Sequence, residues 1–306
     1  MRLDFVCIGA QKAGTTTLHD IIKDHPDIYL PETKEAHFFD VNEKFQKGLD
    51  FFFKNYYKDY VGEKIVGNIN PNLQVETRSI DRLIQSFGKD LKFIFILRDP
   101  VKRAYSHYLM SHRRCLENKS FIEALEIEEF RIANPKRHFD YESNEPGHFE
   151  KNNFGYISRS IYSKTLKHLD NKVPNNNIKL IFFEDLIKNT ETEIENIFQF
   201  LNVSHTENLD FGTLSNSATG IKNRKLEEIL SKPGRVKHYL KRSEVLSKIS
   251  RPILSKLRQI NRKELDPKSK ILSNTDAIYA YENFFKEEID KLEKLTKRDL
   301  SHWRYS

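Results

Sequence analysis

The sequence predicts an α/β fold in which a parallel β-sheet lies between layers of helices, within a single domain spanning residues 1–306. Short apolar runs typical of buried strands recur along the chain, and segments with helical apolar spacing separate them, which favours a parallel sheet covered by helices. A length of 306 residues lies within the range of one large α/β domain. A hydrophobic content of 38% is enough to build a sizeable core.

The chain opens with a strand, a loop and a helix. Residues 5–8 form an apolar run typical of a buried strand, and a loop begins at Gly9. After Gly14, one face of a predicted helix carries Leu18, Ile21 and Ile22. Pro26 ends this helix. Such a unit can place helix N-terminal amides beside a phosphate group.

Two further buried strands are predicted at 92–97 and 178–183. The first runs into Arg98 and then into a helix. The second precedes a helix whose start resembles a capping box, with Thr190 as the cap and Glu193 three residues later.

Three later segments differ in composition. Residues 134–155 are polar and rich in Pro, Gly and Asn, which predicts a long loop or insertion, often a functional lid. Residues 222–263 form a basic helical segment with 14 Lys/Arg against 3 Glu, a net charge of +11. Because the whole chain carries +7, the residues outside this segment sum to −4. Such a segment indicates either an anionic partner or a solvated helix face. The last helix is predicted over 276–295.

The two cysteines, Cys7 and Cys115, form no disulfide framework, which is typical of a reducing compartment. The N-terminal apolar run is short and interrupted by Asp4, unlike a signal peptide, and no later run approaches the ~18 apolar residues of a membrane span. We therefore expect a cytoplasmic protein. The 11 histidines are dispersed, so no metal site is predicted.

The loop over 9–17 is the first candidate site. Gly9 and Gly14 keep the glycine spacing of a Walker A loop, but position 15 is Thr and the lysine lies inside the loop, at Lys12. Backbone amides and a lysine could bind phosphate oxygens there. The displaced lysine argues against an ordinary Mg²⁺-dependent NTPase. The alternative interpretation of the loop is a tight turn.

Arg98 and Ser106 form the second candidate. Arg98 follows a buried strand at its carboxyl end, where open α/β sheets bind ligands, and Ser106 would lie two turns into the next helix. An arginine fork and a hydroxyl suit a terminal phosphate. Alternatively, Arg98 pairs with a carboxylate and Ser106 is merely exposed.

The third candidate is the pair Glu35 and His37. In an extended segment the two side chains would lie on the same side. A carboxylate and an imidazole together could deprotonate an attacking hydroxyl or amine. The alternative is a structural Glu/His pair beside two core phenylalanines.

Three segments, in their order along the chain, resemble motifs of the sulfotransferases that use PAPS (3′-phosphoadenosine 5′-phosphosulfate). They are the loop 9–17, the segment 34–39 and the segment 97–106. The resemblance is closest to the bacterial members and to the branch that includes the heparan sulfate sulfotransferases. It extends to 181–186, 198–203 and 297–303, and so covers nearly the whole chain. It implies a three-layer, P-loop-like fold, with the loop at 134–155 on the acceptor side.

The resemblance also assigns roles to residues. The 5′-phosphosulfate would be bound by Gln11, Lys12, Ala13, Gly14, Thr15, Thr16 and Thr17. Arg98 and Ser106 would bind the 3′-phosphate. Glu35 would be the catalytic base, and His37 would assist it or contact the acceptor. Lys222 and Arg224 fall where the family closes a basic loop over the adenosine bisphosphate PAP.

The expected reaction is in-line sulfuryl transfer from PAPS to a hydroxyl or amine acceptor. A glycan is the first choice of acceptor, and a lipid, acyl or small-metabolite hydroxyl is the alternative. Lys12 would stabilise the leaving PAP, and no metal would be required. No nucleic-acid partner is expected, while peripheral membrane contact through the basic segment is left open. The alternatives are an ATP-dependent metabolite kinase with a modified P-loop, or a non-catalytic binder of anionic glycan or membrane.

The chain departs from the family pattern at one position that affects the acceptor. The family often carries Gly-Glu-x-x-Pro, commonly with a lysine after the glutamate. Here Asn68 and Ile69 stand at those two positions, between Gly67 and Pro71. The departure argues against assigning the substrate of a heparan sulfate enzyme to this chain.

Overall fold

A computed structural model describes residues 1–136, 143–204, 209, 211, 219–231, 244–264 and 271–306. The chain forms two compact units. The first comprises Met1–Arg103, Arg159–Asn216 and Glu287–Ser301. The second comprises Ala104–Ser158, Ser217–Lys286 and His302–Ser306.

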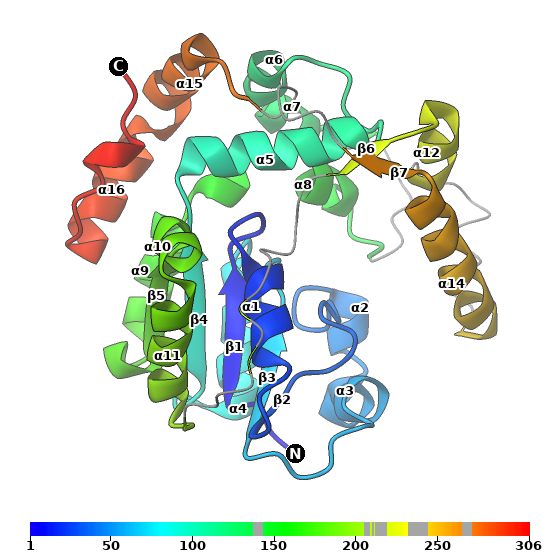
Figure 1. Cartoon of the computed structure of the whole chain (residues 1–306), viewed down its shortest axis with the longest axis vertical. Coiled ribbons are helices and arrows are strands. Elements are labelled where there is room, and N and C mark those ends of the chain that lie inside the picture. Colours follow the sequence, from blue (N-terminus) through cyan, green and yellow to red (C-terminus); the bar gives the residue numbers. More distant parts are fainter. Residues whose placement is uncertain (137–142, 205–208, 210, 212–218, 232–243, 265–270) are drawn as a thin grey trace. The chain divides into compact units, whose positions relative to one another are not determined.

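The first unit contains a five-stranded parallel sheet in the order β2-β3-β1-β4-β5 (Figure 1). Its strands are β1 (Phe5–Gly9), β2 (Ile28–Tyr29), β3 (Ile65–Ile69), β4 (Lys92–Leu97) and β5 (Ile178–Phe182). The central strands β1 and β4 are apolar runs that are buried almost throughout, as the sequence predicts for strands covered on both faces. The predicted parallel sheet is thus confirmed.

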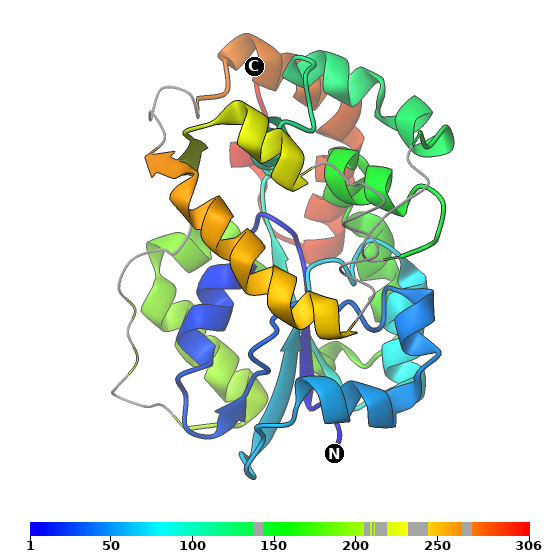
Figure 2. The same ribbon diagram turned by 90° about the vertical axis from the view of Figure 1, so that its right-hand side faces the viewer.

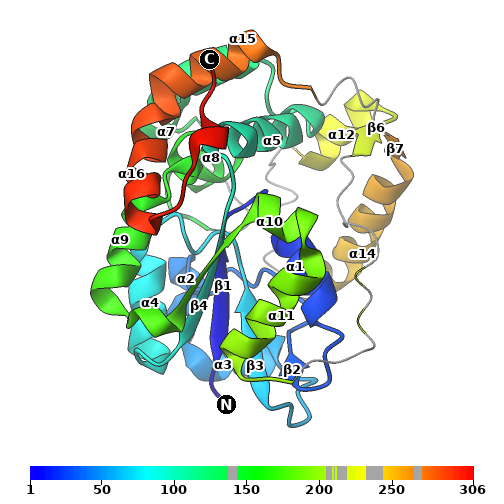
Figure 3. The same cartoon turned by 60° about the vertical axis from the view of Figure 1, so that its left-hand side comes forward.

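Helices cover both faces of this sheet (Figure 3). One face carries α1 (Thr15–Ile22), α10 (Phe183–Lys188) and α11 (Thr190–Leu201), and the other carries α4 (Thr77–Phe87) and α9 (Ser163–Lys172). The unit also contains α2 (Asn42–Phe45), α3 (Gly48–Tyr56) and α16 (Lys286–Thr296). The helices pack through apolar stripes; α4, for example, buries Ile80, Leu83 and Phe87 on one side.

The strand order determines where a ligand can bind. From β1 the chain passes through α1 to the β2–β3 side of the sheet, whereas α4 returns it to β4 on the other side of β1. The connection after β4 leads on to β5, which lies on that other side. The connections after β1 and β4 therefore run in opposite directions from the carboxyl ends of two neighbouring strands. Open α/β sheets bind ligands in the crevice that such a divergence creates. The loop after β1 and Arg98 after β4 both lie at this point.

The second unit is mainly helical (Figure 2). Its helices are α5 (Pro100–Arg113, whose first turn belongs to the first unit), α6 (Phe121–Glu126), α7 (Glu128–Ala133), α8 (His148–Phe154), α12 (Arg224–Ser231), α14 (Glu244–Ile260) and α15 (Asn274–Ala280). The antiparallel strands β6 (Thr219–Ile221) and β7 (Arg262–Glu264) pair beside α12 and α14. Arg258 of α14 donates a 2.7 Å hydrogen bond to the Leu230 carbonyl of α12.

Three local predictions differ from the structure. Residues 148–154 of the loop predicted at 134–155 form α8, and 137–142 lie outside the described residues. The capping box at Thr190 is absent. Asn189 occupies the N-cap position of α11 without a side-chain capping hydrogen bond, and the Thr190 hydroxyl donates to the Leu186 carbonyl of the preceding helix. The last helix is divided by the π-helical turn Tyr281–Phe285.

Candidate functional site

The loop after β1 leads directly into the N-terminus of α1. Gly14 caps this helix with φ +87°, and a Cβ added there would lie 3.1 Å from the ring of Phe183. The positive φ and the tight contact with this ring both favour glycine at position 14. The first amides of a helix have no intrahelical partner, and the first turn of α1 contains no acidic residue. The start of α1 is therefore suited to bind an anion.

Arg98 lies against this loop. Its Nη1 donates a 2.6 Å hydrogen bond to the carbonyl oxygen of Lys12, and its guanidinium lies 4.5 Å from the ring centroid of Phe183. Lys12 itself has φ +71°, a left-handed conformation that a lysine rarely adopts and that is typical of functional loops. The structure thus brings together two candidates that are 86 residues apart in the sequence.

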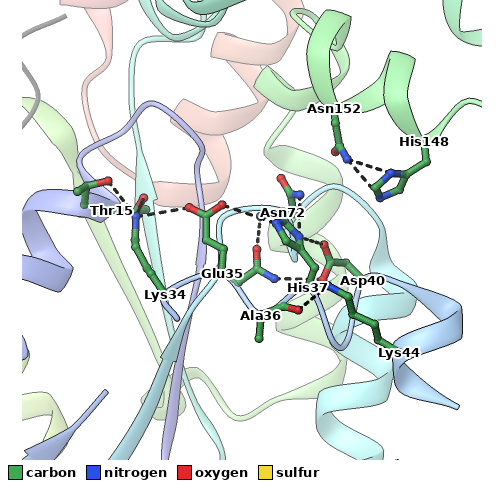
Figure 4. A network of polar contacts seen from close by, with 12 residues as sticks. Thr15, Lys34, Glu35, Ala36, His37, Asp40, Lys44, Asn72, His148 and Asn152 are labelled. Atoms are coloured by element: carbon green, nitrogen blue, oxygen red, sulfur yellow. Dashed lines mark hydrogen bonds and ion pairs between the residues drawn. The ribbon is translucent and has the colours of Figure 1, made fainter. Parts of the chain in front are cut away.

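Lys34 connects the start of α1 with Glu35 (Figure 4). Its Nζ donates a 2.9 Å hydrogen bond to Thr16 Oγ1 and a 3.4 Å one to Thr15 Oγ1. The same Nζ lies 3.5 Å from Glu35 Oε1. Sequence reasoning placed Lys34 in a motif without giving it a role. An anion at the start of α1 and the carboxylate of Glu35 would lie on either side of one ammonium group.

Glu35, His37 and Asp40 form a line of acid, imidazole and acid (Figure 4). His37 Nε2 lies 3.9 Å from Glu35 Oε2, and His37 Nδ1 lies 2.7 Å from Asp40 Oδ2. The segment is not extended as predicted, since His37 has φ +50°. Its turn nevertheless keeps Glu35 and His37 neighbours. Asp40 is the member of this line that the sequence reasoning missed.

The Asp40 carboxylate is nearly buried, with 9% of its side chain exposed. Burial disfavours its charged form, but the neighbouring His37 ring and its hydrogen bond outweigh this effect and hold the pKa of Asp40 below its usual value. A charged Asp40 fixes the ring orientation of His37 and favours a proton on Nδ1.

A second layer of amides supports this line. Asn70 Nδ2 donates a 3.1 Å hydrogen bond to Asp40 Oδ1. Asn72 Nδ2 lies 3.2 Å from His37 Nδ1, but an amide nitrogen is a donor, so the two form no hydrogen bond when the Nδ1 proton points at Asp40. The fully buried Arg159 donates to Asn72 Oδ1. Asn70 and Asn72 follow β3, within and just after the stretch from Gly67 to Pro71 that departs from the family pattern. Asn68 itself is buried and donates to Tyr57 Oη at 3.1 Å, away from this network.

The remaining predicted site residues belong to the second unit. Ser106 lies in α5 and is half-buried. Lys222, which follows β6, and Arg224, the first residue of α12, are exposed. Residues 212–218, just before Lys222, lie outside the described residues. Contact of these three side chains with a nucleotide stays a prediction.

The described part of the basic segment combines cations with apolar side chains. Lys256 and Lys263 are exposed, while α14 also exposes Ile253 to 56% and Ile260 to 58%. Residues 232–243 of the segment lie outside the described residues. Within the described ranges, no helix is long and apolar enough to cross a membrane. The same ranges contain no group of three or more His, Cys, Asp or Glu residues that could hold a metal ion.

Residues 2–261 match the family model described as "Sulfotransferase domain". Among curated proteins, the chain is similar to the "Membrane-associated sulfotransferase kil1" of Dictyostelium discoideum, at 24% identity covering 68% of this chain and 57% of the relative. It is also similar to the human "Heparan sulfate glucosamine 3-O-sulfotransferase 3B1", at 28% identity covering 64% of this chain and 45% of the relative. The chain spans about half the length of these curated relatives.

Solved structures share the fold. A sulfotransferase from Alicyclobacillus acidocaldarius matches with a TM-score of 0.66 and 23% identity over 99% of both chains. The sulfotransferase domain of the Synechococcus PCC 7002 olefin synthase matches with a TM-score of 0.51 and 14% identity, over 98% of this chain and 96% of that one.

Proposed function

Because the chain belongs to the sulfotransferase domain family, we propose that it transfers a sulfuryl group from PAPS to a hydroxyl or amine, with an anionic glycan as the acceptor. One observation carries this proposal: Lys34 Nζ contacts both the first-turn threonines of α1 and the carboxylate of Glu35. A helix start that is suited to an anion and a candidate base thus both contact the side chain of one lysine. Sulfuryl transfer needs these two groups on either side of the reacting sulfur.

The residues of the first unit would divide the reaction between them. The α1 amides, with Gln11, Lys12, Ala13, Gly14, Thr15, Thr16 and Thr17, would bind the 5′-phosphosulfate. Glu35 would take the proton of the acceptor hydroxyl or amine as its oxygen or nitrogen forms the new bond to sulfur. Lys12 would stabilise the negative charge on the phosphate oxygen whose bond to sulfur breaks. A sulfuryl group carries less charge than a phosphoryl group, so lysines and amides can supply this stabilisation without a metal.

Arg98 would bind the 3′-phosphate of the nucleotide, together with Ser106. The position of Arg98 beside the loop of Lys12 supports its share of this role. Lys222 and Arg224 would close over PAP. His37, held by Asp40, would assist Glu35 or contact the acceptor.

Nucleotide binding is tested most directly by thermal unfolding of the full chain. PAP at about 100 times its dissociation constant should add about 2.7 kcal/mol to the free energy of unfolding. For a chain of this size we expect the melting temperature to rise by several degrees. ATP with Mg²⁺ at the same concentration is the control. Stabilisation by ATP–Mg²⁺ and not by PAP would instead indicate the kinase with a modified P-loop.

The described cations of the basic segment favour an anionic acceptor, and the exposed Ile253 and Ile260 favour a membrane surface as a second partner. With labelled PAPS, we expect more transfer to an acidic oligosaccharide than to its uncharged counterpart. The double variant K256E/K263E should raise the KM for the acidic acceptor and leave the KM for PAPS unchanged. Equal labelling of both oligosaccharides would contradict an anionic glycan as the acceptor.

Sedimentation of the unmodified chain with phosphatidylserine vesicles, and not with phosphatidylcholine vesicles, would support a membrane surface as the second partner.

A further inference from the structure

We propose that Lys34 binds the sulfuryl group itself and thereby lets the enzyme distinguish the donor PAPS from the product PAP. This inference rests on the proposed function. It assigns a specificity-determining role to a residue that lies beside the predicted donor loop and outside it in sequence.

The geometry places the Lys34 ammonium at the reacting end of the site. Its Nζ lies 2.9 Å from Thr16 Oγ1 on one side and 3.5 Å from Glu35 Oε1 on the other. If α1 binds the phosphosulfate and Glu35 deprotonates the acceptor, the transferred group must pass between them. Lys34 would then lie beside the path of the sulfur.

Electrostatics favour an anion at this position. The N-terminus of a helix carries about half a positive elementary charge, so a cation at the first turn of α1 is disfavoured. No acidic residue lies in that turn, and threonine hydroxyls carry no charge to offset the lysine. Glu35 supplies one negative charge nearby. A second anion between Lys34 and the α1 amides would compensate the remaining positive charge.

Partial burial strengthens such an interaction. Only 17% of the Lys34 side chain is exposed, so its attraction for an anion is screened less than that of a surface lysine. The side chain is also held by two hydroxyls and one carboxylate, which leaves little freedom to lose when the donor binds. Because PAP lacks the sulfuryl group, it cannot use this contact.

The test compares the affinities of PAPS and PAP, measured by titration calorimetry without acceptor, for the wild-type protein and for Lys34→Met. A charge-assisted contact predicts that Lys34→Met weakens PAPS binding by about tenfold to a hundredfold and changes PAP binding by less than about twofold. Lys34→Arg should restore most of the preference for PAPS. Lys44→Met is the matched control, because it also removes a lysine charge close to this segment: Lys44 Nζ donates to the Ala36 carbonyl. This variant should keep the preference of the wild-type protein for PAPS over PAP.

Each other outcome has a definite meaning. An equal loss for PAPS and PAP would overturn the inference, because Lys34 would then bind a part common to both nucleotides. Unchanged affinities for both would overturn it as well. In either case PAP binding by the wild-type protein would leave the proposed function intact. If the wild-type protein binds neither nucleotide, the proposed function itself fails.

Discussion

Replacing Glu35 by glutamine should lower kcat for sulfuryl transfer by about 10²–10⁴-fold. Glutamine keeps the size of the side chain but cannot accept a proton from the acceptor. His37 Nε2, 3.9 Å from the Glu35 carboxylate, is held on its other side by Asp40 and should not replace the lost base fully. The measurement is a steady-state assay with labelled PAPS and saturating acceptor.

The control for this variant is nucleotide affinity. Glu35 contacts Lys34 and His37 and lies outside the donor loop, so Glu35→Gln should bind PAP nearly as tightly as the wild-type protein. Its melting temperature should also change little, since the carboxylate is 37% exposed and exposed ion pairs contribute little stability. Full activity in Glu35→Gln would remove Glu35 from the role of base.

Replacing Lys12 by methionine should lower kcat by about 10²–10³-fold, the usual cost of removing one group that stabilises developing charge. In the proposed reaction, negative charge grows on the leaving phosphate oxygen during the transition state. The Lys12 ammonium should therefore act more strongly there than on the bound donor. Single-turnover measurement with excess enzyme would report the chemical step directly.

The division between kcat and KM separates this role from simple binding. A higher KM for PAPS with unchanged kcat would show that Lys12 binds donor and transition state equally, which would contradict the proposed role. Lys12→Arg keeps the charge and is the matched variant, and it should recover part of the rate. The main-chain carbonyl of residue 12, which accepts from Arg98, is present in all three proteins.

The sequence was most informative where structure is determined locally. The strand predicted at 92–97 coincides with β4, and the glycine spacing of the first loop located the start of α1. In each case apolar spacing and turn residues act over a few positions. The Glu35–His37 pair was located by its motif, although the backbone conformation that joins them was predicted wrongly. Nothing in the local pattern indicated the positive φ of His37.

Most of the supporting contacts could not be predicted because they join distant segments. Arg159 reaches Asn72 across 87 residues, and Lys34 reaches Thr16 across 18. A lysine or an asparagine in a polar loop is usually solvated, so residue type alone gives no signal. Asp40 ends the stretch that contains Glu35 and His37, three residues after His37. Only the fold shows that its carboxylate turns back to the imidazole.

The ring of Phe183 has a wider consequence, because it touches two functional segments. It fills the space that a side chain at Gly14 would need, and it lies under the guanidinium of Arg98. A shift of this ring would alter the start of α1 and the orientation of Arg98 together. The free-energy changes caused by substitutions at positions 14 and 98 should therefore be non-additive. A single aromatic side chain couples the two segments that would bind the opposite ends of the nucleotide.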